Sequence, residues 1–294
     1  MLDTFSPAAI RIDRPVHVFG ASVDISVLRL DEVHPVISGN KWFKLRYYID
    51  EAKSTGKKNI VTFGGAWSNH IVATAAACHM NGLTSTGLIR GEEPTQLSPT
   101  LLQASQYGMK LVFLSRAAYS EKHVPAEFDN DYFIAEGGYG PTGAMGAATI
   151  LDHSSASYTH YCCAVGTGTM MAGIINRSSP QQQVTGISVM KNNRQLDDMV
   201  ANLVLAENKS RSWQLLHDYH FGGYAKYEPA LLQFMNDFYR ETGIPSDFVY
   251  TGKLFYAVND LARKGYFPQG SRLLLIHSGG LQGNASLRKG TLMF

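Results

Sequence analysis

"HYCCAVGTGTMMAGIINRSS", residues 160–179, joins an apolar run to a glycine-rich turn and then to a second apolar segment. The run at 160–166 is continuous rather than alternating, which predicts a strand buried on both faces, as in parallel sheets. The segment after the turn has the pattern of a helix. A buried strand that passes through glycines directly into a helix is a building unit of α/β folds.

The same unit recurs along the chain, which implies parallel sheet covered by helices on both faces. There are more strands than one sheet comfortably holds, so we expect an α/β fold of parallel-rich open sheets in two domains that share a cleft. The predicted strands span 59–65, 84–91, 109–115, 132–138, 160–166, 184–190 and 272–280. The predicted helices span 68–82, 98–108, 142–154, 167–179, 194–207, 229–243 and 253–265.

The composition is that of an ordinary globular protein with a lightly charged surface. Of the 294 residues, 45% are apolar and 17% are charged, and the net charge is +2. This charge gives no field that would attract nucleic acid or an anionic membrane. No apolar run reaches membrane-spanning length, and the N-terminal segment has no apolar core of a secretory signal. We therefore expect a cytoplasmic protein that binds neither nucleic acid nor membrane.

The three cysteines predict neither a disulfide framework nor a metal site. Two of them, Cys162 and Cys163, are adjacent, and none has the spacing of a metal ligand. The histidines are scattered as well. We expect buried, reduced thiols and no bound metal.

In open parallel sheets the chemistry collects at the carboxyl ends of the strands. This rule selects five stretches: "GGAWSNH" (64–70), "EGGYGPTG" (136–143), "VGTGT" (165–169), "VYTGK" (249–253) and "HSGG" (277–280).

The "VGTGT" turn has backbone N–H groups that could cradle a phosphate at the start of a helix. A dinucleotide-binding fingerprint is the first alternative, but it requires glycine where this chain has Met171, and an acid near 186–190 that is absent. A phosphate-binding loop of the Gly-Lys-Ser/Thr type does not fit either. A plain tight turn is the remaining alternative.

Ser68 and Asn69 begin a predicted helix. Both residue types are common helix caps without further function, but the same N–H groups and hydroxyl could also bind a carboxylate. Tyr250 is predicted at the end of a strand and the mouth of a helix, where the helix dipole would favour a phenolate and proton transfer. Tyr224 is flanked by glycines, and Ser278 ends a buried strand.

Lys41 and Lys44, in "SGNKWFKLRYY" (38–48), occupy the positive end of a predicted helix and repel each other across one turn. Either both are solvated surface lysines, or an anion belongs between them. Pyridoxal phosphate would explain the pair, because it needs one neutral lysine amine for a Schiff base. The helix end and the neighbouring ammonium would lower the pKa of Lys41, and Lys44 would lie near the phosphate.

"SGNKWFKL", "GGAWSNH", "VGTGT", "VYTGK" and "HSGG", in this order and at these separations, resemble the D-cysteine desulfhydrase and 1-aminocyclopropane-1-carboxylate deaminase family. This family belongs to the tryptophan-synthase-β-like, fold type II, pyridoxal-phosphate enzymes. The resemblance implies a large cofactor-binding domain from 1–44 and 151–294, a small domain from 45–150, an active site between them, and a homodimer.

The resemblance also implies roles for individual residues, with Lys41 as the Schiff-base lysine and the loop 166–169 around the phosphate. Cofactor contacts are implied for Lys41, Lys44, Asn69, Gly166, Thr167, Gly168, Thr169, Thr251 and Ser278. Substrate contacts are implied for Trp67, Ser68, Asn69, His70 and Tyr224, and catalytic roles for Lys41, Ser68, Tyr224 and Tyr250.

Two positions separate the branches of this family: the deaminase branch is expected to carry Glu and Leu where this chain has Thr251 and Ser278. A carboxylate beside the pyridine nitrogen makes the ring a strong electron sink, as opening a cyclopropane requires. A hydroxyl leaves the nitrogen largely neutral, which suffices to expel a thiolate. We expect β-elimination from a small D-amino acid such as D-cysteine, giving pyruvate, ammonia and sulfide, with Lys41 or Tyr250 taking the Cα proton.

Two departures from the family bear on the substrate: Trp67 stands in "GGAW" where Gly-Gly-Ile-Gln is usual, and the 150–220 region is short. D-serine or a β-chloroalanine-type substrate is therefore open. The alternative functions are a 1-aminocyclopropane-1-carboxylate deaminase that releases 2-oxobutyrate, an NAD-binding oxidoreductase, and a non-catalytic binder of small molecules.

Overall fold

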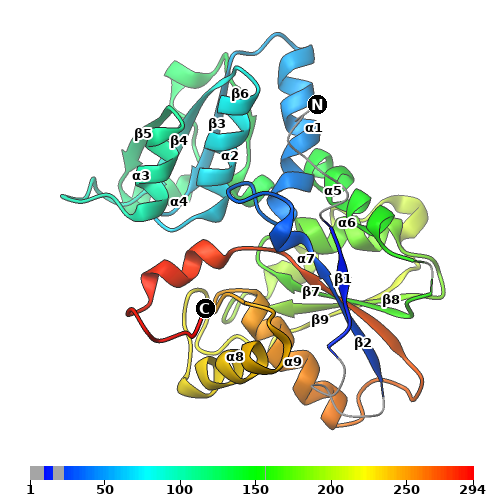
Figure 1. Cartoon of the computed structure of the whole chain (residues 1–294). Helices are drawn as coiled ribbons and strands as arrows, with labels where there is room; N and C mark the ends of the chain where they lie inside the picture. Colours follow the sequence, from blue (N-terminus) through cyan, green and yellow to red (C-terminus); the bar gives the residue numbers. More distant parts are fainter. Residues whose placement is uncertain (1–9, 16–22, 156) are drawn as a thin grey trace.

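The computed structural model describes residues 10–15, 23–155 and 157–294, which form two separate sheets with helices packed around them. Figure 1 shows the smaller sheet in the upper left and the larger one in the lower right. The expected α/β fold of parallel-rich sheets is confirmed. The expectation that the chain starts without a secretory signal concerns residues 1–9, which lie outside the described residues.

The large sheet, as far as the chain is described, has six strands in the order β1-β2-β10-β7-β8-β9. All its neighbouring pairs are parallel except β1 and β2. Because the chain leaves this sheet after β2 and returns at β7, the centre of the sheet combines distant segments. The strands are β1 (Ile12–Asp13), β2 (Asp24–Arg29), β7 (His160–Val165), β8 (Gln183–Ser188), β9 (Ser212–Leu216) and β10 (Arg272–His277).

The small sheet has the order β5-β4-β3-β6, and each of its pairs is parallel. Its strands are β3 (Asn59–Gly64), β4 (Thr84–Arg90), β5 (Met109–Leu114) and β6 (Tyr132–Ile134). The strands of this sheet all come from one continuous stretch of chain. The proposed domain boundaries at 44/45 and 150/151 stay a prediction.

Helices cover the sheets and fill the space between them. Helix α1 packs on α2 and α5, and α5 packs on α6, so these helices connect the two sheets (Figure 1). Helices α6 and α9 both pack against β7 and β8. The helices are α1 (Asn40–Ser54), α2 (Asn69–Met80), α3 (Pro99–Gln106), α4 (Arg116–Glu121), α5 (Pro141–Ala148), α6 (Thr169–Arg177), α7 (Gln195–Ala201), α8 (Pro229–Thr242) and α9 (Thr251–Arg263).

The three cysteines are free and buried, as expected. Cys162 and Cys163 belong to different apolar clusters, because successive residues of a strand point to opposite faces of the sheet. Burial raises the pKa of the Cys163 thiol to about 12. No helix of the described chain has the length and apolarity to cross a bilayer. Within the same residues, no group of His, Cys, Asp and Glu side chains could hold a metal ion.

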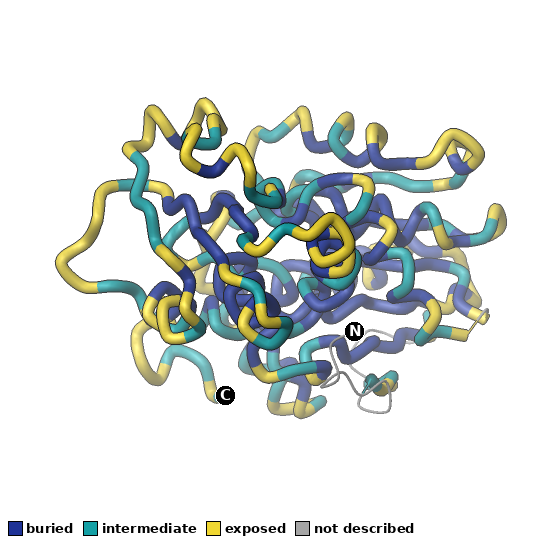
Figure 2. The backbone as a smooth tube through the Cα atoms, turned by 90° about the horizontal axis from the view of Figure 1, so that it is seen from above, coloured by how far each residue is buried: buried dark blue, intermediate teal, exposed yellow. Residues whose placement is uncertain are grey.

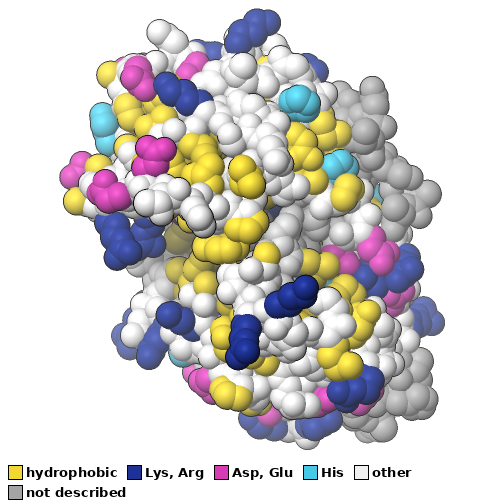
Figure 3. Space-filling model, turned by 60° about the vertical axis from the view of Figure 1, so that its left-hand side comes forward, with side chains coloured by type: hydrophobic (Ala, Val, Ile, Leu, Met, Phe, Trp, Pro, Cys, Tyr) yellow, Lys and Arg dark blue, Asp and Glu magenta, His cyan; other side chains and the backbone are white. Residues whose placement is uncertain are grey.

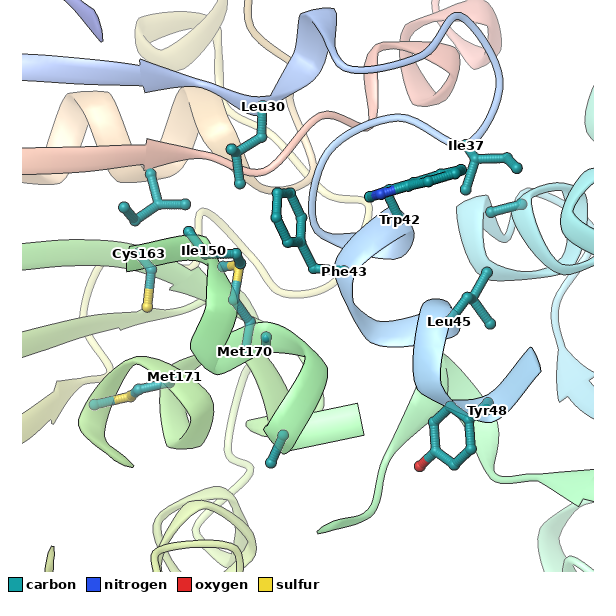
Figure 4. Close-up of a cluster of buried hydrophobic side chains, with 14 of the residues drawn as sticks. Leu30, Ile37, Trp42, Phe43, Leu45, Tyr48, Ile150, Cys163, Met170 and Met171 are labelled. Atoms are coloured by element: carbon teal, nitrogen blue, oxygen red, sulfur yellow. The ribbon is translucent and has the colours of Figure 1, made fainter. Parts of the chain in front are cut away.

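The main core lies between the sheets and fixes the start of α1. Trp42, Phe43 and Leu45 are all buried. Figure 4 shows Phe43 pointing toward Leu30 and Ile150, while Trp42 lies beside Ile37. The buried backbone is concentrated in the middle of the molecule and exposed segments lie around it (Figure 2). The lysines on either side of Trp42 and Phe43 are therefore held in place by packing.

Most predicted elements are confirmed. The sequence-based prediction missed β1, β2, β9 and α4: β1 and α4 are only two and six residues long, β2 ends in the charged Arg29, and β9 is a partly buried edge strand. Strand β6 ends at Ile134, since the next residues form a short turn of 3-10 helix at Glu136–Gly138. The helices predicted at 142–154 and 194–207 each end early: α5 passes directly into a 3-10 turn at Thr149–His153, whereas α7 ends at Ala201 and a separate 3-10 turn follows at Ala206–Asn208. No strand precedes Tyr250, so that prediction is wrong.

Candidate active site

The carboxyl ends of the strands of both sheets open on one cleft of about 980 Å³. Figure 3 shows the surface hollowed between the two halves, with lysine and arginine side chains flanking the hollow. Most residues predicted for the site line this cleft: Lys41, Lys44, Trp67, Ser68, Asn69, His70, Gly166, Thr167, Gly168, Tyr224, Tyr250 and Ser278. Thr169 and Thr251 are fully buried and are not among the lining residues.

The start of α1 lies against the end of β10. Gly39 has φ +65°, and a Cβ on it would lie 1.8 Å from the Ser278 carbonyl oxygen, so only glycine fits. The Asn40 N–H donates to the same oxygen at 3.2 Å. The "SGNK" and "HSGG" motifs thus form one unit that presents Lys41 and Ser278 to the cleft.

Lys41 is a lysine of lowered pKa that faces the cleft. Its Nζ donates to Asn40 Oδ1 at 2.8 Å. Burial lowers the pKa of Lys41 from 10.5 to about 8, and the negative charge of Asp247 partly opposes this. The expected lowering is confirmed, but its cause is burial rather than the second lysine. A substantial fraction of this amine is therefore neutral near pH 8.

Lys44 is buried deeper, beside the loop expected to hold the phosphate. Its Nζ donates to the Gly137 carbonyl oxygen at 2.5 Å. A Cβ on Gly137 would lie 2.8 Å from Thr167 Cγ2, which places Gly137 against the glycine loop. Burial, and then the charge of Lys41, hold the pKa of Lys44 well below its usual value. An anion bound here would favour its charged form.

The loop 166–169 leads from β7 into α6. Gly168 caps the helix with φ +84°, and the hydroxyls of Thr167 and Thr169 lie 3.2 Å apart. The first turn of a helix carries N–H groups without intrahelical partners and the positive end of the dipole. Because Gly166, Thr167 and Gly168 line the cleft, these groups could bind an anion there.

The start of α2 also lines the cleft. Ser68 caps the helix, as its residue type and position predict: its Oγ accepts from the Ile71 N–H at 3.4 Å. Asn69 Oδ1 is buried without a partner. A Cβ on Gly280 would lie 3.0 Å from Asn69 Nδ2 and 3.4 Å from Asp247 Oδ2, which places Asn69 next to the "HSGG" turn.

His70 presents a bare ring nitrogen. The Thr62 hydroxyl donates its one proton to the Ile134 carbonyl oxygen at 2.7 Å, so at the 2.9 Å contact with His70 Nε2 it must accept. His70 Nδ1 is consequently unprotonated, and it is buried without a partner. Burial and the charges of Lys44 and Lys41 hold the pKa of His70 well below its usual value.

Tyr224 and Tyr250 contact each other in the wall of the cleft. The Tyr250 hydroxyl donates to the Tyr224 oxygen at 3.4 Å, and the ring centroids are 5.9 Å apart. Burial raises the pKa of Tyr250 well above its usual value. The expectation of a phenolate at Tyr250 is therefore wrong: the desolvation of its hydroxyl outweighs the helix dipole.

Asp247 was not singled out from the sequence, yet it organises the start of α9. Its Oδ1 accepts from the N–H groups of Val249 and Tyr250 at 2.9 and 2.7 Å. Its Oδ2 accepts from the Thr251 N–H at 3.0 Å and from the Thr251 hydroxyl at 2.7 Å. The Thr251 hydroxyl therefore donates to Asp247, and Thr251 does not line the described cleft; its contact with the cofactor stays a prediction. An acid four residues before a helix start was the available signal.

The small sheet contributes the outer edge of the cleft. Trp67 lines it and is 41% exposed. Glu136 accepts from the Tyr119 hydroxyl and from Lys122 Nζ, both at 2.6 Å. Of the described residues lining the cleft, Glu136 is the one acid, and both of its oxygens are already engaged.

The residues present fit a small molecule that carries an aldehyde and a phosphate. The partly neutral Lys41 could bond the aldehyde, and the first turn of α6 with Lys44 could hold the phosphate. The unpartnered Asn69 Oδ1 and His70 Nδ1 are buried polar atoms of the kind that a ligand satisfies. The fold and the site together define an enzyme that works through a lysine amine beside an anion site.

Comparison with known proteins identifies the family. A model of the family described as pyridoxal-phosphate dependent enzymes matches residues 12–279. The chain belongs to this family, and pyridoxal phosphate is its cofactor. An NAD-binding oxidoreductase is thereby set aside.

Three relatives show how near the likeness is. A Pyrococcus horikoshii protein provisionally named 1-aminocyclopropane-1-carboxylate deaminase is 30% identical, over 88% of this chain and 85% of that one. The Arabidopsis thaliana bifunctional D-cysteine desulfhydrase/1-aminocyclopropane-1-carboxylate deaminase is 27% identical, over 95% and 79%. A crystal structure of an ACC deaminase homologue superposes with a TM-score of 0.80 at 27% identity, over 94% and 90% of the chains.

Proposed function

We propose that this enzyme catalyses β-elimination from a small D-amino acid such as D-cysteine. The overall reaction converts D-cysteine and water to pyruvate, ammonia and hydrogen sulfide. The bonds broken are the Cα–H bond, the Cβ–S bond and the Cα–N bond, and no oxidant or reductant is needed. This proposal rests on the chemistry of the cleft and on the family to which the chain belongs.

Different side chains of the cleft can bind the substrate, hold the cofactor and transfer protons. When bound, the cofactor supplies an electron-withdrawing ring that acidifies the Cα proton. Lys41 would hold the cofactor, and its amine could take the Cα proton, since a pKa of about 8 leaves a substantial fraction of it unprotonated near pH 8. Tyr250, kept protonated by burial, donates rather than accepts a proton. The Ser68 hydroxyl and neighbouring N–H groups hold the substrate carboxylate.

The observation that carries the choice of reaction is the lack of a free carboxylate on the described walls of the cleft. Glu136 is engaged by Tyr119 and Lys122, and the end of β10 offers the Ser278 hydroxyl. Opening a cyclopropane ring needs a strongly electron-withdrawing, protonated pyridine, which a free carboxylate would maintain. Expelling thiolate from Cβ needs less, so β-elimination suits this site.

A second candidate is deamination of 1-aminocyclopropane-1-carboxylate to 2-oxobutyrate and ammonia. The names of several relatives favour it. It would require the ring-protonating acid to come from outside the described walls of the cleft, or from Asp247 through Thr251.

The experiment is a product assay of the purified holoenzyme with D-cysteine, L-cysteine, D-serine, β-chloro-D-alanine and 1-aminocyclopropane-1-carboxylate. We expect pyruvate from D-configured substrates with a β-leaving group, and sulfide from D-cysteine. A Lys41→Ala variant is the control for non-enzymatic release. Formation of 2-oxobutyrate as the dominant product would overturn the proposal in favour of the second candidate, and cofactor binding without turnover would indicate a non-catalytic binder.

The homodimer, the cytoplasmic location and the division into 1–44 with 151–294 and 45–150 stay predictions. Light scattering of the purified holoenzyme tests the first of these: we expect twice the mass of the 32.3 kDa chain.

A further inference from the structure

We propose that Lys253 is a positioning residue. Its ammonium holds the turn that contains Tyr224, and thereby keeps Tyr224 in contact with Tyr250. Lys253 is the last residue of "VYTGK", and the proposed chemistry gives it no role. The inference rests on the proposed function only in that Tyr224 is taken to act in the cleft. It adds the residue that puts Tyr224 there.

The contacts of Lys253 point away from the cleft and into the turn. The side chain is fully buried near the start of α9. Its Nζ donates to the carbonyl oxygens of His220 and Gly223, each at 2.8 Å. These carbonyls bracket the residues just before Tyr224, so one side chain holds both ends of the bend.

The turn needs such a clamp because its backbone is unfavourable. Phe221 and Ala225 have φ of +50° and +52°, which non-glycine residues rarely adopt. Gly222 and Gly223 have φ of +89° and +118°. Strained conformations of this kind persist only where surrounding contacts hold them. The turn itself is mostly exposed, and Gly223 is its one buried residue between 222 and 228.

Among the described residues, the other contacts of the turn do not anchor the carbonyl directly before Tyr224 to the rest of the protein. The Gly223 N–H donates to the His220 carbonyl at 3.0 Å, and the Lys226 N–H donates to the Gly223 carbonyl at 3.1 Å, both within the turn. The ring of Phe221 packs on Tyr256 at 4.8 Å, which fixes the beginning of the turn. The ammonium of Lys253 ties the carbonyl directly before Tyr224 to helix α9, and charge-assisted bonds of this kind are stronger than neutral ones.

A role for Lys253 as a catalytic amine fits the structure less well. It does not line the described cleft, and its amine is shielded by the turn that it holds. Its distinguishing feature is the pair of main-chain acceptors. Loss of these bonds should free the turn and let Tyr224, 46% exposed, leave Tyr250.

The first test is hydrogen exchange on the holoenzyme of Lys253→Met, which keeps the length and removes the donors. Lys264→Met, at the exposed end of the same helix, is the matched control. We expect exchange in 220–226 to rise about tenfold or more in Lys253→Met, as for lost charge-assisted hydrogen bonds. Exchange elsewhere and in the control should stay at the wild-type level. An unchanged turn would overturn the inference.

The second test is a double-mutant cycle with Tyr224→Phe, measured as kcat and KM. We expect kcat to fall about 100-fold in Lys253→Met, as for a displaced reacting group, with a smaller change in KM. In the Tyr224→Phe background the same change should cost less than about threefold, because coupled residues are not additive. Additive losses would overturn the inference, as would full activity in Tyr224→Phe. Neither result would touch the product assay of the proposed function.

Discussion

Lys41 and Lys253 are two lysines with nearly the same electrostatics and different surroundings. Each lies in the first turn of a helix, α1 or α9, and burial lowers the pKa of each to about 8, with Asp247 opposing the shift. The Lys253 ammonium donates two hydrogen bonds to main-chain carbonyl oxygens inside the protein. Lys41 bonds to its neighbour Asn40 and faces the cleft.

The comparison separates a lowered pKa from a chemical role. A reactive amine needs a neutral form and also an open approach for the electrophile. Lys41 has a lowered pKa and an open approach from the cleft, whereas Lys253 has a lowered pKa but no open approach from the described cleft. The same distinction holds for hydroxyls: Ser278 faces the cleft, whereas the Thr251 hydroxyl donates its hydrogen bond to Asp247. The reacting groups are distinguished from the positioning groups by facing the cleft, more than by residue type.

The largest effect should follow from removing the free amine. Lys41→Ala should abolish the yellow colour that survives dialysis in the wild-type holoenzyme, and lower kcat by about 10⁴-fold, the upper end for losing an acid–base group. Absorbance spectra and single-turnover rates check this. Lys253→Met should keep the colour. A colourless Lys253→Met beside a coloured Lys41→Ala would reverse the two assignments.

The next largest effect should follow from neutralising Asp247, whose negative charge acts on the pKa of both lysines. In Asp247→Asn, the amide nitrogen would face the N–H and hydroxyl of Thr251 and could accept from neither. Two buried donors would lose their acceptor, so the free energy of unfolding should fall by about 3 kcal/mol. Urea denaturation measures it, and Asp237→Asn on the exposed face of α8 is the control. A loss no greater than the control's would remove Asp247 from its organising role.

The smallest effects should distinguish the two hydroxyls. Thr251→Val removes a buried donor to Asp247 and should lower the free energy of unfolding by about 1–2 kcal/mol. Ser278→Ala, at the wall of the cleft, should leave the free energy of unfolding within about 0.5 kcal/mol while weakening cofactor binding several-fold. Thermal denaturation and cofactor titration are the measurements. The opposite pattern would mean that Thr251, not Ser278, serves the cofactor.

Much of the fold and of the cleft could be predicted from local pattern. Continuous apolar strands ending in glycines gave β3, β7 and β10, and the cap residue Ser68 and the loop before α6 followed from helix-end chemistry. Side chains next to these strand ends reach the cleft because parallel strands end at one edge. Lys41 was recognisable because a lysine at a helix start is unfavourable without a partner.

The rest depends on contacts that no local pattern encodes. The strand β2 ends in Arg29, which is 3% exposed and paired with Asp13, Asp31 and Glu32. Its partners come from outside the strand, so no pattern within residues 24–29 predicts that this charged end is buried. The direction of Thr251 likewise depends on Asp247, and the state of Tyr250 depends on burial by Tyr224 and its surroundings. Lys253 belongs to the "VYTGK" motif, but its role could not be predicted because its acceptors lie in a turn some thirty residues away in the sequence.

Covalent capture of the cofactor tests the central claim most directly. The cofactor-free protein is incubated with pyridoxal phosphate across a series of pH values, reduced with borohydride, and digested for peptide mapping. Because the neutral amine is the reactive form, labelling should rise with pH. We predict one label, at Lys41, with half-maximal labelling near pH 8 rather than near the ordinary lysine value of 10.5. Label at Lys44 or Lys253 with Lys41 unmodified would contradict the account.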